Sequence, residues 1–336
     1  MYWNIYEILA YQRNFNLING PRSIGKTYTT QKYIIKHAIN KNSEFVYLVR
    51  TKNEIQEGIF ERAFEKVVNN EYANNEIMFT KDECFLLDDD NRTLGYCLAI
   101  SDYVKIKTKS FPNVKFLLFD EYMLDTDKKS ARYVSGWNEP DLFLNIYHTI
   151  DREEDRVICF LLGNNTMFYN PYHIHPAFNI PNIEEGKIWY SENVLFQRAV
   201  ADDELKEAKS HSKFLKMISN TNYGDYASNG TYKDNIIEFI KPLSKGCAYK
   251  FGIIYNDIKF GIYVNYKEGL IYVSDKYNQS PVNLAITTDD HRENTLLTKS
   301  ENSWLAWLRD NFKRGNVRFT TPEVKARFMP GLAMLL

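Results

Sequence analysis

The chain has 336 residues, which is enough for two domains that each bury a hydrophobic core. Its net charge of −1 excludes a globally basic surface, so any nucleic-acid contact must come from local patches or from assembly. The aromatic content of 15% excludes a disordered chain, and four separated cysteines without a C-x-x-C pair are typical of reduced thiols in a cytosolic protein. We expect no signal peptide and no membrane span, because no apolar run approaches the ~20 residues that a span needs.

Residues 20–27 read GPRSIGKT and fit the P-loop pattern G-x-x-x-x-G-K-[ST]. A short buried strand is predicted before them and a helix after them, so backbone N–H groups and the helix dipole favour a bound phosphate. Lys26 is expected to reach the β- and γ-phosphates, and Thr27 to hold Mg²⁺. A glycine-containing turn that binds nothing is the alternative. The candidate nucleotide-binding residues are Gly20, Pro21, Arg22, Ser23, Ile24, Gly25, Lys26 and Thr27.

A second buried strand is predicted at 44–50, because its sequence EFVYLVR is apolar almost throughout, as in parallel sheets. Lys52 follows its carboxyl end, where α/β sheets place ligand-facing loops. One helix is expected from Glu54 to about Asn69. Short strands are expected next, with the last two joined as a hairpin. These strands are residues 77–79, 84–87 and 94–100.

The sequence VKFLLFDE at 114–121 has the form of a Walker B strand, a buried strand that ends in two acids. Asp120 is expected to hold Mg²⁺ through its water shell, and Glu121 to polarise the attacking water. An ordinary buried strand followed by two surface acids is the alternative. The distance along the chain from Lys26 to Asp120 leaves room for an additional strand between the P-loop and Walker B strands.

A third core strand is predicted at 157–163, after a helix at 141–150 and a charged turn at 151–156. Asn164, which follows this strand, is our candidate for sensing the γ-phosphate; a hydrogen-bonded turn asparagine is the alternative. The stretch after it, up to about residue 199, is rich in Tyr, Pro and Asn, with one late strand at 187–190. Its pair of histidines, at 173 and 175, is expected to lie in a loop and to bind no metal.

In-line hydrolysis of ATP often needs a further cation from outside the site. Arg152, in the charged turn, is the candidate for serving a neighbouring subunit's site as an arginine finger. The alternative is a rim salt bridge with the acids beside it, which is normally worth little. Lys107 and Lys109 are weaker candidates for the same task, and Arg22 for a phosphate contact within its own chain.

The last third of the chain has a different, antiparallel pattern. Strands are expected at 249–255, 258–265 and 270–274, joined by tight turns into a meander that resembles the start of an RNase H-type domain. An amphipathic helix is expected at 302–312. Such a domain usually carries an acid in the centre of its first strand, and 249–255 has none, so we interpret it as inactive as a nuclease.

Four stretches resemble the encapsidation ATPases of the small phi-twenty-nine-like podophages, which are DNA-packaging motor proteins. They are GPRSIGKT, EFVYLVR, FPNVKFLLFDE and DREEDRVICFLLGN, in this order. FGIIYNDIKFGIYVNYKEGLIYV and LAITTDD resemble that family's C-terminal domain, so the resemblance covers most of the chain at low overall identity. It depends on motif order more than on any single motif.

The resemblance implies an α/β fold with a P-loop ATPase domain of the ASCE type (additional strand, catalytic glutamate) and a central parallel sheet at 1–200. A helical linker at 201–230 and a smaller α+β RNase H-like domain at 231–336, a vestigial nuclease, would follow. The implied activity is that of an ATP hydrolase with Mg²⁺, in a homopentameric ring on the portal of an empty capsid, driving double-stranded DNA inward. Such a protein works in the host cytoplasm and on the procapsid, and is not in the mature virion. A packaging RNA takes part in some of these motors, and its role here stays open.

By matching motifs, the resemblance gives Lys26 and Thr27 the Walker A roles and Asp120 and Glu121 the Walker B roles. Arg152 then matches the finger that acts on the neighbouring subunit.

Two more lysines match positions of that family. Lys107 matches a basic residue associated with the intersubunit contact, and Lys52 falls where the family places a DNA-gripping lysine in the pore. A net charge near zero is compatible with this, since a ring repeats each lysine around the duplex and the grip must also release. A terminase with an active nuclease, and a P-loop assembly switch that does not translocate, are the alternative functions.

Overall fold

The computed structural model describes residues 3–41, 43–87, 91–124, 133–201, 207, 212–218, 221, 238–278, 282–298 and 302–335, without the side chains of Trp137 and Leu215. The chain divides into two compact units, Met1–Asp234 and Asn235–Leu336. Most of the expected linker, 201–230, lies outside the described residues, apart from a short helix α9 (Lys213–Ile218), so the three-part division stays a prediction. No helix among the described residues is both long and apolar enough to cross a membrane.

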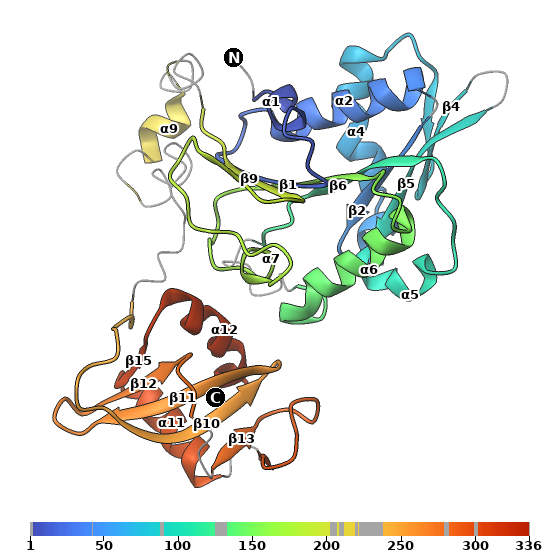
Figure 1. Ribbon diagram of the computed structural model, residues 1–336. Coiled ribbons are helices and arrows are strands. Elements are labelled where there is room, and N and C mark those ends of the chain that lie inside the picture. The colour runs from blue at the N-terminus through green and yellow to red at the C-terminus, as the bar shows by residue number, and fades with distance from the viewer. Residues whose placement is uncertain are drawn as a thin grey trace. The chain divides into compact units, whose positions relative to one another are not determined.

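The larger unit contains one nine-stranded sheet. Its strands are β1 (Phe15–Asn19), β2 (Glu44–Val49), β3 (Ile77–Phe79), β4 (Glu83–Leu86), β5 (Arg92–Ala99), β6 (Val114–Asp120), β7 (Ile158–Gly163), β8 (Ile188–Tyr190) and β9 (Val194–Arg198). The strand order is β3-β4-β5-β2-β6-β7-β1-β9-β8 (Figure 1). From β5 to β9 every neighbouring pair is parallel, and antiparallel strands complete both edges.

This order confirms the predicted α/β fold and its additional strand, because β7 lies between the P-loop strand β1 and the Walker B strand β6. The parallel strand β9 is missing from the sequence-based prediction. It begins with three apolar residues and ends in Gln197 and Arg198, within a stretch rich in polar residues, so its five residues carry little periodic signal.

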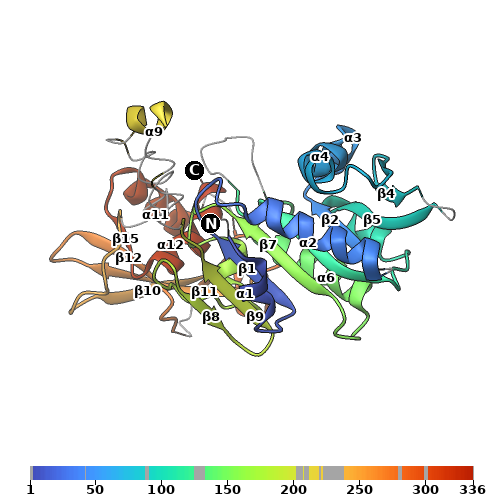
Figure 2. The same cartoon turned by 90° about the horizontal axis from the view of Figure 1, so that it is seen from above.

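Helices cover both faces of this sheet, since alternate residues of each buried strand point to opposite faces. They are α1 (Ile5–Leu9), α2 (Lys26–Lys41), α3 (Lys52–Gln56), α4 (Ile59–Glu71), α5 (Tyr103–Ile106), α6 (Glu139–Asp151) and α7 (Pro171–Ile174). One apolar core joins α1, α2 and α4 to the sheet, and another joins α5, α6 and α7 (Figure 1). Figure 2 looks down on the first face, where α2 runs over the strands.

The single helix expected after β2 is instead two helices, α3 and α4. Gly58 separates them with φ +71°, a left-handed conformation that ends α3 and that glycine adopts without steric cost. α4 then buries Phe60, Phe64 and Val67 against the sheet. The break lets the two helices leave β2 in different directions.

In the smaller unit, the described residues form a six-stranded mixed sheet and two helices. Its elements are β10 (Ala248–Tyr255), β11 (Ile258–Asn265), β12 (Leu270–Ser274), β13 (Asn283–Ala285), β14 (Leu296–Leu297), α11 (Ser303–Lys313), β15 (Val317–Phe319) and α12 (Pro322–Ala333). The order is β14-β13-β10-β11-β12-β15, with the predicted meander at its centre and β13 parallel to β10. Side chains of α11 and α12 share one core with the sheet, which agrees with the predicted RNase H-like α+β unit.

The meander has two glycines opposite each other, Gly252 in β10 and Gly261 in β11. A Cβ on Gly261 would lie 2.1 Å from the carbonyl oxygen of Lys276, and one on Gly252 would lie 2.5 Å from the ring of Tyr277. The segment after β12 therefore passes directly over these strands, and only glycine leaves room for it.

Candidate active site

The P-loop joins β1 to α2, and the side chain of its lysine, Lys26, is hydrogen-bonded to the backbone of the loop. Ser23 and Gly25 have φ values of +61° and +92°, so the chain turns sharply before the helix begins. The ammonium group of Lys26 donates hydrogen bonds of 2.9 Å to the carbonyls of Gly20 and Pro21, and Lys26 is only 7% exposed. Lys26 therefore lies within the loop, which is the place from which it can reach a bound phosphate.

The two expected metal-holding residues meet in the structure. The hydroxyl group of Thr27 donates a 3.2 Å hydrogen bond to the carboxylate of Asp120, across 93 residues of sequence. Burial, with a smaller effect of the Glu121 charge, raises the pKa of Asp120 to about 6, against the hydrogen bond from Thr27 and the charge of Lys26. A hydroxyl and a carboxylate at the end of a phosphate-binding loop are suitable oxygen donors for Mg²⁺ and its water shell.

Glu121 and Asn164 face the same cavity as the P-loop. This cavity has a volume of about 1140 Å³ and is lined by Arg22 to Thr27, Asp120, both of these residues, and side chains of α1, α2 and α4. Glu121 is exposed and has a left-handed backbone, with φ +57°. The carboxylate is therefore in contact with the space where a nucleotide and an attacking water would lie.

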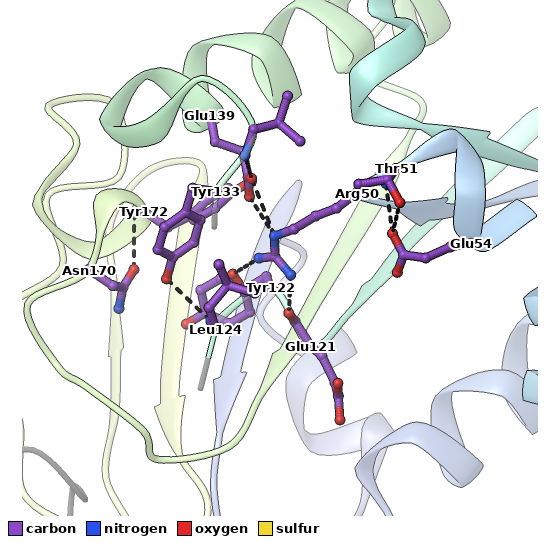
Figure 3. A network of polar contacts seen from close by, with 11 residues as sticks. Arg50, Thr51, Glu54, Glu121, Tyr122, Leu124, Tyr133, Glu139, Asn170 and Tyr172 are labelled. Atoms are coloured by element: carbon purple, nitrogen blue, oxygen red, sulfur yellow. Dashed lines mark hydrogen bonds and ion pairs between the residues drawn. The ribbon is translucent and has the colours of Figure 1, made fainter. Parts of the chain in front are cut away.

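A buried arginine holds the backbone of the loop that follows β6 (Figure 3). Arg50, just after β2, donates hydrogen bonds to the carbonyls of Glu121, at 2.8 Å, and of Tyr122. Its Nε lies 3.2 Å from the carboxylate of Glu139, which is fully buried at the start of α6 and also accepts a 2.9 Å hydrogen bond from the hydroxyl group of Tyr172. Arg50 thus connects the loop after β6 to α6 and α7.

Further contacts complete the surroundings of this ion pair. The guanidinium of Arg50 lies 5.0 Å from the ring centroid of Phe119 and 5.2 Å from that of Tyr133, and the N–H of Val134 donates a 2.6 Å hydrogen bond to Glu139. Burial raises the pKa of Glu139, and the charge of Arg50 opposes that rise. Both charges are therefore paired and hydrogen-bonded, as buried charges need to be.

A second set of buried polar contacts, centred on Tyr122, joins the loop after β6 to the end of β1 and to α7. The hydroxyl group of Tyr122 lies 2.7 Å from Oδ1 of Asn19, the last residue of β1, and 2.6 Å from Nε2 of His173 in α7. Burial lowers the pKa of His173 to about 3, so the ring is neutral. A Cβ on Gly163 would lie 2.9 Å from the side chains of both Asn19 and Tyr122, so β7 needs glycine at its end.

The three remaining site candidates are exposed and do not line the cavity. Lys52 is the first residue of α3, and its N–H donates a 3.1 Å hydrogen bond to the hydroxyl group of Ser101. Lys107 follows α5, and its ammonium group lies 5.4 Å from the ring centroid of Tyr103. Arg152 ends α6 with a left-handed backbone, and its guanidinium has no partner among the described residues of its own chain. All three are available to a molecule outside the chain.

Comparison with known proteins gives the family. The family model described as "Podovirus DNA encapsidation protein (Gp16)" matches residues 1–328 of this chain. The chain belongs to this family of phage DNA-packaging proteins.

Individual relatives agree with it. The DNA packaging protein of Bacillus phage phi29 is 28% identical over 330 residues, which cover 97% of this chain and 95% of that protein. A chain of the bacteriophage phi-29 viral genome packaging motor assembly superimposes with a TM-score of 0.76 and 25% identity, over 100% of this chain and 99% of that chain. The crystal structure of the N-terminal domain of the DNA packaging ATPase from bacteriophage phi29 has a TM-score of 0.52 and 26% identity, over 61% of this chain and 97% of that domain.

Sequence patterns picked out residues that line the cavity, Lys26, Thr27, Asp120, Glu121 and Asn164, but missed the buried residues packed around them. Arg50 and Glu139 are 89 residues apart, so no spacing links them; the only signal is a charged residue directly after a buried strand. His173 was expected in a loop, but it lies in α7 and is completely buried. A lone histidine gives no sequence signal for such a position.

Proposed function

We propose that this protein is the ATP-hydrolysing subunit of a ring motor that moves double-stranded DNA through the portal into a preformed capsid. The observation that carries the proposal is the meeting of Thr27 and Asp120 beside Lys26, with Glu121 and Asn164 facing the same cavity. Membership in a family of DNA-packaging proteins supports DNA movement as the process that ATP hydrolysis at this site would drive.

Each residue then has a role in the transfer of the γ-phosphoryl group to water. Lys26 and the P-loop N–H groups hold the phosphates, and Glu121 accepts a hydrogen bond from the attacking water and orients it. Asn164 contacts the γ-phosphate and reports its loss to β7. Bound Mg²⁺, held by Thr27 and Asp120, supplies charge stabilisation for the phosphate oxygens.

The exposed cationic side chains make contacts with other molecules. Arg152, with Lys107 as a weaker candidate, serves the phosphates of a neighbouring subunit, and Lys52 contacts the DNA backbone in the pore of a homopentamer. A few lysines per subunit are enough for a grip that depends on phosphate contacts and must be released in each cycle. The partners are DNA, the portal of the procapsid and, in motors that use one, a packaging RNA; the protein works in the host cytoplasm and on the procapsid, and is absent from the mature virion.

The smaller unit serves in docking and not in DNA cleavage. The centre of β10 is Phe251, Gly252 and Ile253, and Gly252 is covered by Tyr277. Over the described parts of the chain, no group of three or more histidine, cysteine or acidic side chains is arranged to hold a metal ion. An RNase H-type site usually has an acid in the centre of its first strand, so the residues at the centre of β10 favour a vestigial nuclease domain.

The decisive experiment measures DNA-stimulated ATPase activity with and without portal-bearing capsids, and packaging in parallel. Glu121→Gln is expected to keep nucleotide binding and lose both activities. If Glu121→Gln packages DNA normally, the protein is a nucleotide switch and not a motor. If the wild type cuts DNA with Mn²⁺ or Mg²⁺, the terminase alternative holds.

Mixed rings test whether a site is shared between subunits. Lys26→Ala removes a chain's own site and Arg152→Ala removes the finger that it gives to its neighbour. A mixture of the two is expected to recover ATPase activity that neither has alone. Failure to recover at any ratio, with both variants assembled, would contradict the assignment of Arg152.

A further inference from the structure

The turn that carries Arg152 has an unusual backbone. Arg152, Glu153 and Asp155 have φ values of +56°, +62° and +52°, and none of them is glycine. Residues with a side chain seldom adopt this conformation, because it is strained, and they persist where the surrounding structure determines the backbone. Three of them within four residues indicate that this turn is held in one shape.

Asp151 provides one set of restraints. It is the last residue of α6 and is only 1% exposed. Its carboxylate accepts hydrogen bonds from three consecutive backbone N–H groups, those of Asp155 at 3.0 Å, Arg156 at 2.9 Å and Val157 at 2.9 Å. One carboxylate therefore closes the whole turn from α6 to the start of β7.

Arg156 provides a second set of restraints on the turn and also bonds to the segment before β6. Its guanidinium donates to the carbonyl of Ile150 at the end of α6, and to the carbonyls of Phe111, at 2.9 Å, and Val114. Its Nε donates a 2.7 Å hydrogen bond to Glu154, and the side chain is 10% exposed. Arg156 thus fastens the Arg152 turn to the segment between α5 and β6.

That second segment carries the other cation proposed to face a neighbouring subunit. Lys107 lies four residues before Phe111, which is itself buried in the core shared with α5 and α6. α5 and α6 lie on the same face of the sheet (Figure 1). Arg156 is therefore bonded both to the end of α6, which precedes Arg152, and to the segment that follows Lys107, while its own side chain is too buried to reach a partner.

We propose that Asp151 and Arg156 are positioning residues, which hold the Arg152 turn and the segment after Lys107 as one rigid support, so that these two cations are presented in a fixed place to the triphosphate bound to a second copy of this chain. The inference rests on the proposed function, in which Arg152 acts across a subunit boundary. A finger that is rigid before binding loses less conformational entropy when it meets the phosphates, and a misplacement of 1 Å can cost on the order of 10²-fold in rate.

The test uses full-length chains assembled on portal-bearing capsids. Arg156→Lys keeps the charge but cannot donate to three carbonyls in the fork geometry of a guanidinium. We expect a loss of ATPase activity on the order of 10²-fold, with unchanged affinity for ATP, because the variant's own P-loop is intact. Mixed with Lys26→Ala chains, whose turns are intact, the variant is expected to recover activity.

Controls separate this role from a general loss of structure. Arg92→Lys removes another arginine-to-carbonyl contact of the same unit, to Ile39, and is expected to keep full activity. Asp151→Asn is the second variant, in case Arg156→Lys does not assemble, and should show the same recovery in mixed rings. Reduced ATP affinity, or no recovery by either assembled variant, would overturn the proposal.

The outcome also distinguishes this inference from the function on which it rests. If Arg152→Ala recovers in mixtures and Arg156→Lys does not, shared sites stand and the positioning role fails. If Arg152→Ala itself does not recover, the shared site fails and the positioning role fails with it.

Discussion

Arg50 and Glu139 form an ion pair that is almost completely removed from water, at 10% and 0% side-chain exposure. Removing one partner of such a pair leaves a buried charge unpaired, which typically costs 3–5 kcal/mol. We therefore expect Glu139→Ala to lower the free energy of unfolding of the larger unit by about 4 kcal/mol, measured by urea denaturation.

The chain offers a matched control for this prediction. Arg198 pairs with Glu185 at 3.0 Å, but Glu185 is 36% exposed. Glu185→Ala is expected to cost at most about 1 kcal/mol, as for exposed pairs. Equal costs for the two variants would mean that the ion pair at Arg50 contributes no more than a surface contact.

His173 gives a prediction about pH. Burial lowers the pKa of His173 to about 3 from an ordinary value of 6.5. Between pH 3 and pH 6.5 the unfolded chain therefore binds a proton at this ring, and the folded chain does not. The contribution of the neutral ring is fully present above pH 6.5 and is lost progressively as the pH falls toward 3, by up to roughly 5 kcal/mol. His173→Gln removes this titration and keeps a group that can hydrogen-bond to Tyr122.

Urea denaturation of both proteins between pH 7.5 and pH 4.5 checks this. The difference in unfolding free energy between wild type and variant is expected to move in favour of the variant as the pH falls. A difference that stays constant would show that the pKa of His173 is the same in the folded and the unfolded chain, which contradicts its burial as a neutral ring.

At the scale of elements, sequence predicts best what repeats locally. β2, β6 and β7 are runs of apolar residues, so these strands could be predicted from sequence, and the P-loop after β1 and the Walker B acids at the end of β6 could be recognised by their local patterns. β9 could not, because five residues with two polar ones give no clear period. The contacts of Arg50, Asp151 and Arg156 depend on which segments pack together, and no local pattern encodes that.

The paired glycines of β10 and β11 lead to a prediction about the stability of the smaller unit. Gly261→Ala would place a Cβ 2.1 Å from a backbone oxygen, which cannot move as a side chain can. We expect the smaller unit to lose about 2–3 kcal/mol, the upper part of the range for overpacked cores. Gly269→Ala is the control, since its surroundings are open and only its φ of +66° is strained, at about 1 kcal/mol.

Thermal unfolding of the two variants compares these costs. The larger loss is expected for Gly261→Ala. If Gly269→Ala is equally destabilised, the segment after β12 does not pass over the meander as tightly as the distances indicate.

At the scale of the whole molecule, the two units have separate hydrophobic cores, and the proposed nucleotide site is built from residues of the larger unit. A ligand stabilises only the unit whose folded form binds it, by about 2.7 kcal/mol at 100 times its dissociation constant. We expect two thermal transitions, of which a non-hydrolysable ATP analogue with Mg²⁺ raises one, by roughly 5–10 °C for a unit of this size. Gly261→Ala should lower the other transition, which identifies it, and Lys26→Ala should abolish the effect of the nucleotide. If the analogue raises both transitions equally in the wild type, the two units unfold as one, and the separate cores do not make them energetically independent.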